Sequence, residues 1–152
     1  MDTRKSIEFL TKNAKETMGL GEESAQKVLE TRSGERAAIL GLIGNLGGGK
    51  TTFLHGFAKG LGIKEKVNSP TFIIMRRYKM QDARYKNFYH LDCYRLNKPR
   101  EILDLGWKEI IENPKNIVAV EWAGKMKKIM PQETIWLNFE FVNDKTRKIV
   151  LK

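Results

Sequence analysis

One stretch of the chain decides its fold: Gly44-Asn45-Leu46-Gly47-Gly48-Gly49-Lys50-Thr51. It matches the phosphate-binding loop pattern, which is a glycine, four residues of any type, and then Gly-Lys-Ser/Thr. Glycines let backbone N–H groups turn toward phosphate oxygens, and the helix that follows adds the positive end of its dipole. In such a loop Lys50 would reach the outer phosphates, and the Thr51 hydroxyl would be offered to Mg²⁺.

The sequence on either side of the loop supports this interpretation. Residues 37–43 form a nearly unbroken apolar run that is typical of a buried strand. After the loop, apolar residues recur at helical spacing, namely Phe53, Leu54, Phe57, Ala58 and Leu61. Gly60 and Gly62 are candidate left-handed stops for that helix. The alternative, a flexible glycine-rich turn, is disfavoured because motif and context agree.

Length and composition predict one domain over residues 1–152. A chain of 152 residues with 41% hydrophobic content can bury one ordinary core. The single cysteine, Cys93, excludes an internal disulfide and a cysteine-based zinc site. No apolar run approaches the ~20 residues of a membrane span, and the N-terminus lacks a secretory signal pattern. We therefore expect a cytoplasmic protein that does not enter a membrane.

The chain is strongly basic, with a formal net charge of +10. Two clusters stand out, Arg76-Arg77-Tyr78-Lys79 and Lys125-Met126-Lys127-Lys128. They could attract RNA or an acidic partner surface. A solvated basic face is slightly favoured, because Asp and Glu are interspersed and no long block of like charge occurs.

Further elements can be placed from their patterns. We expect a first strand near residues 6–11, a helix near 14–30, a strand at 72–75, a short helix at 99–106, and a C-terminal β-hairpin of residues 134–141 and 147–151. The predicted fold is α/β, a three-layer P-loop NTPase-like domain with a mixed sheet and a C-terminal antiparallel hairpin.

Two acidic residues each end an apolar, β-prone run. Asp92 follows residues 88–91, and Glu121 follows residues 117–120. In a phosphate-loop protein, an acid at the carboxyl end of a buried strand stands beside the loop and can hold Mg²⁺ directly or through water. Either carboxylate could instead cap a helix or pair with a lysine.

Three other features allow more than one interpretation. The segment Ser69-Pro70-Thr71 could sense a terminal phosphate, as switch loops do, or could only cap a turn. His90 lies in a strand-like run and is expected to be a hydrogen-bonded structural histidine rather than a base. Trp122 is expected to pack at a strand end rather than to stack on a nucleotide.

Taken in order, several motifs together resemble the bacterial TsaE (YjeE) family. They are Glu16-Thr17, the loop Gly44 to Thr52, Ser69-Pro70-Thr71-Phe72, His90-Leu91-Asp92-Cys93-Tyr94-Arg95-Leu96 and Glu121-Trp122. That family is the ATPase component of the machinery that makes threonylcarbamoyladenosine at position 37 of tRNAs reading codons that begin with A. The resemblance extends from the first helix to the final strands, and the combination of motifs is specific.

The resemblance implies ATP and Mg²⁺ as ligands, with Lys50, Asp92 and Glu121 serving hydrolysis and Thr51, Glu121 and Asp92 serving the metal. It places ATP on Gly47, Gly48, Gly49, Lys50, Thr51 and Thr52, with Thr17 near the nucleotide, and the phosphate-loop pattern adds Gly44, Asn45 and Leu46 as nucleotide-binding residues. It also implies the TsaB and TsaD proteins as partners, tRNA through their complex, and Tyr94 and Arg95 as possible partner contacts. Two features depart from the family pattern: Asn45 replaces the usual Asp, and the tract Arg76 to Lys79 is unusually basic.

Two other functions remain open from the sequence. A small-molecule or nucleoside kinase would share the loop but pass phosphate to an acceptor. A nucleotide-gated RNA-binding module would bind RNA with a steep dependence on salt and without turnover. The chain contains no recognisable RNA-binding motif, which argues against the second. If the chain is an ATPase, we expect it to be slow alone, because no arginine can be assigned to the transferring phosphate.

Overall fold

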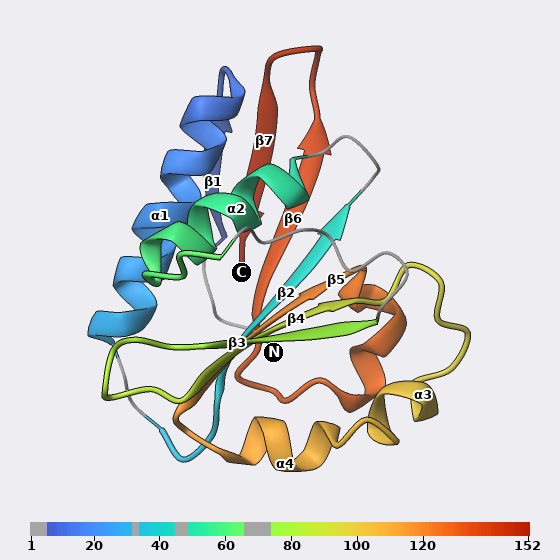
Figure 1. Ribbon diagram of the computed structural model, residues 1–152. Coiled ribbons are helices and arrows are strands. Elements are labelled where there is room, and N and C mark those ends of the chain that lie inside the picture. The colour runs from blue at the N-terminus through green and yellow to red at the C-terminus, as the bar shows by residue number, and fades with distance from the viewer. Residues whose placement is uncertain (1–5, 32–33, 45–48, 66–73) are drawn as a thin grey trace.

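A mixed sheet organises the chain in the computed structural model, which describes residues 6–31, 34–44, 49–65 and 74–152 (Figure 1). Its seven strands lie in the order β1-β7-β6-β2-β5-β4-β3. The strands are β1 (Ile7–Thr11), β2 (Ala38–Gly44), β3 (Met75–Lys79), β4 (Asn87–Asp92), β5 (Asn116–Glu121), β6 (Ile135–Phe141) and β7 (Arg147–Leu151). β2 is parallel to β5 and β6, and β4 is parallel to β5. The outer pairs β1–β7, β6–β7 and β3–β4 are antiparallel, which confirms the mixed sheet and the C-terminal hairpin.

Helices cover both faces of the sheet and complete three layers. They are α1 (Ala14–Glu30), α2 (Lys50–Gly60), α3 (Arg100–Leu103), α4 (Trp107–Glu112) and the 3₁₀ helix η1 (Ala123–Ile129). Successive strand residues point to opposite faces. Accordingly, Phe88 packs in the core beneath α1 and α2, whereas Tyr89 packs in the core beneath α3, α4 and η1. Figure 1 shows these two helical layers on either side of the sheet.

Close packing of α1 on α2 depends on glycine. A Cβ at Gly21 would lie 2.1 Å from the Phe53 carbonyl oxygen, and one at Gly56 would lie 1.9 Å from the Met18 carbonyl oxygen. The same reason corrects the prediction for Gly60, which does not stop the helix in a left-handed conformation. It is the last residue of α2, and a Cβ there would meet the Ala25 side chain at 2.7 Å. Gly62, with a φ of 83°, has the left-handed conformation that was expected.

The strand predicted at residues 72–75 is displaced along the chain. β3 begins at Met75 and contains the basic tract through Lys79, whereas Ile74 precedes the strand and residues 72 and 73 lie outside the described residues. The prediction relied on an apolar run, but β3 is an outer strand and needs few apolar residues. Tyr78 is buried in one core, and Met75 packs partly buried against the other. The motif Ser69-Pro70-Thr71-Phe72 also lies outside the described residues.

Candidate functional site

The site is built around the first residue of α2. Gly49 caps this helix with a φ of 98°, a left-handed conformation that favours glycine. The Lys50 side chain is buried, with the residue only 6% exposed, and its Nζ donates a hydrogen bond to the Gly44 carbonyl at 2.7 Å. Nζ also lies 4.3 Å from the centroid of the Trp122 ring. The end of β2, the start of α2 and the residue after β5 thus meet at this ammonium group.

Burial lowers the pKa of Lys50 from its ordinary value, because desolvation disfavours the charged amine. The negative charges of Glu121 and Asp92 act in the opposite direction and raise it. A further anionic group at this place, such as a phosphate, would favour the charged form more. Lys50 is thus a buried amine whose charged form is disfavoured by burial and favoured by the two neighbouring carboxylates.

The two predicted acids stand side by side at the carboxyl ends of parallel strands. Asp92 of β4 is the register partner of Glu121 of β5, which is also the register partner of Leu42 in β2. Glu121 is 3% exposed, and its Oε1 accepts a hydrogen bond from the Thr51 hydroxyl at 3.5 Å. The Asp92 carboxylate is more accessible, and its Oδ1 accepts from the backbone N–H of Tyr94 at 3.0 Å.

These oxygen atoms form a donor set suited to a hard divalent cation. In the ranges that the structure describes, no three His, Cys, Asp or Glu side chains converge as a ready-made metal cluster. Mg²⁺ generally keeps several waters and uses one or two carboxylates together with substrate phosphates. Thr51, Glu121 and Asp92 are therefore compatible with the metal ligands predicted from the sequence.

His90 adds a partner to the buried carboxylate. Its Nε2 donates to Glu121 Oε2 at 2.8 Å, and the two side chains are 2% and 4% exposed. His90 Nδ1 is buried and makes no hydrogen bond to any atom of the described residues. The expectation of a hydrogen-bonded structural histidine agrees with this geometry, but sequence reasoning did not find its partner. The pairing fixes which oxygen of Glu121 faces Thr51.

Thr17 of α1 lies against Gly49, the residue before Lys50. Its hydroxyl lies 2.7 Å from that of Thr11, and a Cβ placed on Gly49 would be 3.4 Å from Thr17 Cγ2. Arg147 is a neighbour that sequence reasoning missed, since the same Cβ would be 3.5 Å from Arg147 Cγ. Arg147 opens β7 and donates to the Asn143 carbonyl at 2.6 Å. Nothing in the local sequence distinguished it from the other basic residues of the hairpin.

An aromatic pair connects the buried lysine to the surface. Trp122 has a φ of 57°, the one left-handed conformation of a residue other than glycine in the described ranges. Its ring centroid lies 4.9 Å from that of Tyr94, which is 44% exposed. Lys125 donates through Nζ to the Tyr94 carbonyl and to the Leu96 carbonyl. Trp122 thus packs between Lys50 and Tyr94 just after the end of β5.

The structure brings together most of the predicted site. The residues that meet at this edge are Thr17, Gly44, Gly49, Lys50, Thr51, Asp92 and Glu121. Thr52 is half-buried in the first turn of α2. Asn45, Leu46, Gly47 and Gly48 lie outside the described residues.

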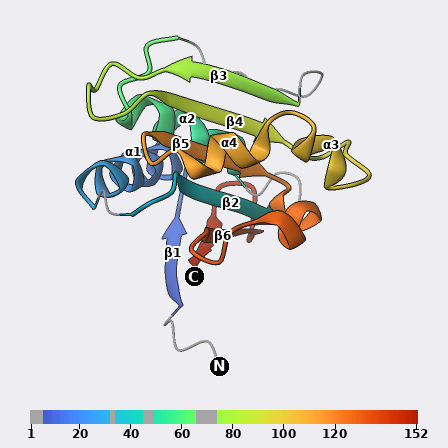
Figure 2. The ribbon, with the colours of Figure 1, turned by 90° about the horizontal axis from the view of Figure 1, so that it is seen from below.

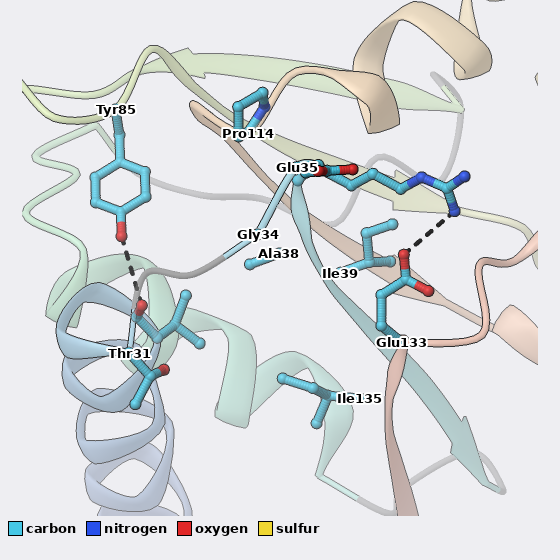
Figure 3. Close-up of a pocket in the computed structure, with 12 residues that line it drawn as sticks. Thr31, Gly34, Glu35, Ala38, Ile39, Tyr85, Pro114, Glu133 and Ile135 are labelled. Carbon is cyan, nitrogen blue, oxygen red and sulfur yellow. Dashed lines mark hydrogen bonds and ion pairs between the residues drawn. The ribbon is translucent and has the colours of Figure 1, made fainter.

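The other end of the parallel strands carries a separate cavity of about 570 Å³ (Figure 3). It lies between the start of β2 and the loops that hold Tyr85, Pro114 and Glu133. Tyr85 donates to the Leu29 carbonyl at 3.3 Å, and Arg36 donates to Glu133 at 3.2 Å. The ion pair Arg36–Glu133 in its lining is thus exposed at the surface rather than buried.

A strand, a glycine-containing loop sequence and a helix, flanked by acids on neighbouring parallel strands, define a P-loop NTPase-like α/β domain. The family model described as "Threonylcarbamoyl adenosine biosynthesis protein TsaE" matches residues 11–149. The chain belongs to the TsaE family, which is involved in threonylcarbamoyladenosine biosynthesis on tRNA.

Individual relatives agree with the family model. The chain is 35% identical to the tRNA threonylcarbamoyladenosine biosynthesis protein TsaE of Bacillus subtilis over 95% of this chain and 84% of that protein. It is 33% identical to the TsaE protein of Haemophilus influenzae over 82% of this chain and 75% of that protein. The crystal structure of YdiB from Bacillus subtilis superimposes with a TM-score of 0.75 at 29% identity, covering 99% of this chain and 87% of that one. Across the described residues, no helix is both long and apolar enough to cross a membrane.

Proposed function

We propose that this chain binds ATP·Mg²⁺, hydrolyses it slowly, and thereby serves threonylcarbamoylation of adenosine 37 in tRNAs that read codons beginning with A. One observation carries the proposal. The buried Lys50 ammonium, the Thr51 hydroxyl and the Glu121 carboxylate converge where α2 begins, next to the carboxyl end of β5. This is where a P-loop protein holds the outer phosphates and their metal ion.

Lys50 would bind the nucleotide by exchanging partners. In the structure its Nζ donates to the Gly44 carbonyl, a neutral acceptor. A phosphate oxygen carries negative charge and accepts a shorter, stronger hydrogen bond. Because Lys50 is already desolvated, little further desolvation of the amine accompanies binding. The N-terminal N–H groups of α2 would add donors and the helix dipole to the same phosphates.

Thr51, Glu121 and Asp92 would hold the magnesium ion and orient water. When bound, Mg²⁺ supplies positive charge that neutralises the outer phosphates. Glu121 is fixed by His90 and faces the Thr51 hydroxyl, which suits a metal ligand or its water. Asp92 is more accessible and would order a metal-bound water or the attacking water. Either acid could make the direct metal contact.

Thr17 and Arg147 would border the nucleotide on the side of the final hairpin. Both lie against Gly49, the last loop glycine before Lys50. The Arg147 guanidinium donates to the Asn143 and Thr146 carbonyls and lies over the Phe141 ring. These contacts hold the Arg147 guanidinium at the final hairpin. No arginine is assigned to the transferring phosphate, and slow hydrolysis by the isolated chain is proposed on that ground.

We further propose TsaB and TsaD as the partners, with tRNA reached through their complex. The exposed Tyr94 ring contacts Trp122, which in turn contacts Lys50, so this surface would sense occupancy of the nucleotide site. Leu103 and Leu105 are 45% and 41% exposed on the segment that follows Tyr94. An aromatic anchor with exposed leucines is typical of a protein-binding surface.

The test combines two products. The purified chain would be incubated with ATP and Mg²⁺, alone and with TsaB, TsaD and substrate tRNA, while free phosphate and modified nucleoside are measured together. We expect slow phosphate release alone and dependence of sustained tRNA modification on this chain. A phosphorylated small molecule in place of free phosphate would instead identify a kinase. Normal sustained modification without this chain would contradict the proposal.

A further inference from the structure

We propose that the outer edge of β3 binds the phosphate backbone of a folded RNA. The five basic residues that form this region, called here the β3 surface, are Arg76, Arg77, Lys79, Arg84 and Lys86. This surface is separate from the proposed nucleotide-binding site around Lys50. The choice of RNA as the polyanion rests on the proposed function in tRNA modification, whereas the surface itself does not.

Position in the sheet makes this surface accessible. β3 is the last strand of the sheet at the edge opposite β1, and β4 is its partner among the described strands (Figure 2). Arg76, Arg77 and Lys79 are all exposed. Strand residues alternate between faces, so Arg77 and Lys79 share one face about 7 Å apart and Arg76 lies on the other. Cations therefore line both sides of one edge.

Few acids offset the charge of the β3 surface, and Glu65, from the segment after α2, is one whose charge acts on Tyr78 of β3. Between residues 75 and 86 five basic residues face one acid, Asp82, which pairs with Arg84 at 2.7 Å. The other four cations make no ion pair with any residue in the described ranges. Lys115 extends the surface, since its carbonyl accepts from the Lys86 backbone N–H at 2.7 Å. Such unpaired cations attract a polyanion and release its counterions on binding.

The apolar content of the surface favours RNA over an acidic protein. Protein interfaces have a buried core of apolar and aromatic side chains. The large exposed apolar residues among those described all lie elsewhere: Ile7, Leu10, Tyr94, Leu103, Leu105, Phe141 and Val142. Contacts to phosphates need cations and no apolar core. The β3 surface has the cations and, among the described residues, lacks large exposed apolar side chains.

The geometry lets RNA bind without covering the nucleotide site. Met75, at the start of β3, is the register partner of Leu91, next to Asp92. Lys79 is the register partner of Asn87, at the opposite end of β4. The basic residues thus run from the edge of the site toward the far end of the sheet, and the turn with Arg84 and Lys86 continues in that direction.

Salt-dependent RNA binding provides the test. Fluorescence anisotropy would follow binding of an unmodified tRNA transcript to the full chain, without nucleotide, over a salt series. We expect R76E/R77E/K79E to bind at least tenfold more weakly near physiological salt. Since each phosphate contact contributes about 0.7 to 0.9 to the slope of log K against log salt, losing three contacts lowers the slope by about 2 to 3. The matched control K15E/K27E/K108E reverses three exposed lysines on α1 and α4.

Each outcome decides the proposal. An equal loss in the control, or an unchanged slope in R76E/R77E/K79E, overturns it, because net charge alone would then explain the binding. Loss of TsaB–TsaD binding with unchanged RNA binding assigns the surface to an acidic protein and also overturns it. If the triple variant does not fold, R77Q and K79Q singly should each lower the slope by about 0.7 to 0.9. Failure of ATP hydrolysis would remove the proposed function but leave this measurement readable.

Discussion

The two ends of the parallel strands differ: the amino ends carry a large cavity, whereas the carboxyl ends carry the buried charged side chains. At the amino ends, a cavity of about 570 Å³ is bordered by the exposed pair Arg36–Glu133. At the carboxyl ends, three polar side chains are each at most 6% exposed, those of Lys50, His90 and Glu121. Lys50 donates to the Gly44 carbonyl at 2.7 Å, and His90 donates to Glu121 at 2.8 Å. Burying a charged group costs free energy unless a partner stabilises it. Buried charged groups therefore indicate a functional site better than the volume of a cavity does.

The largest expected effect is at Lys50. Lys50→Ala removes the ammonium group that would meet the outer phosphates, and we expect a loss of ATP affinity or turnover of at least a hundredfold, on the scale of one transition-state charge contact. Titration calorimetry with ATP, together with phosphate release, would measure it. Thermal unfolding is the control, since a loss of fold would make the variant uninformative.

A pH series would sharpen the same prediction. Burial lowers the pKa of Lys50, so its charge is lost as pH rises through a value below that of an exposed lysine. ATP affinity of the wild type should therefore fall on the alkaline side earlier than ordinary lysine titration predicts. The affinity of the Lys50→Ala variant should lack this fall.

The acids come next. Glu121→Ala and Asp92→Ala should each lower Mg²⁺-dependent hydrolysis about a hundredfold, because removing one well-placed electrostatic group costs ~3 kcal/mol in the transition state. Steady-state phosphate release over a Mg²⁺ series would measure both. Near-normal turnover by both variants would place the metal elsewhere.

A smaller effect is expected at His90, which acts through Glu121. His90→Ala should weaken the Mg²⁺ dependence of ATP binding by about tenfold, the lower range for loss of a hydrogen-bond partner behind a metal ligand. His90→Gln keeps an N–H donor near Nε2 and should restore part of the loss. The measurement is nucleotide binding at varied Mg²⁺ and does not need turnover. Equal affinity in all three proteins would assign His90 to packing alone.

The smallest effect belongs to the amino ends. Arg36→Ala and Glu133→Ala break an ion pair whose side chains are 52% and 57% exposed, and such pairs contribute about 0 to 1 kcal/mol. We expect small changes in the free energy of unfolding, measured by urea denaturation, and unchanged ATP binding. A large loss of ATP binding in either variant would indicate that the nucleotide binds at the amino ends of the strands, and would contradict the proposed site.

The sequence predicted those parts whose chemistry is local. The glycine pattern placed the start of α2 after Gly49. The apolar runs ending in Asp92 and Glu121 placed both acids, because strand direction alone brings parallel strand ends together. Contacts between distant elements were out of reach. Neither the partnership of His90 with Glu121 nor the approach of Arg147 to Gly49 leaves a local pattern.

The predicted boundaries of β3 were wrong for a related reason. An outer strand needs few apolar residues, so the basic tract gave no strand pattern although it pairs with β4 from Met75 to Lys79. The prediction for Gly60 was wrong because this glycine allows close contact with α1. A glycine near a helix end can serve either as a left-handed helix stop or as a close-packing position, and the sequence alone does not distinguish the two. Both errors concern tertiary placement rather than local propensity.

The most direct test of the account is a crystal structure of the chain with Mg²⁺ and a non-hydrolysable ATP analogue. The account predicts the triphosphate at the start of α2, with Lys50 Nζ moved from the Gly44 carbonyl to a phosphate oxygen. It also predicts Mg²⁺ at about 2.0 to 2.1 Å from Thr51 Oγ1, with Glu121 or its bound water completing the coordination. Nucleotide in the cavity at the amino ends of the strands, or metal without contact to Thr51, Asp92 or Glu121, would contradict it.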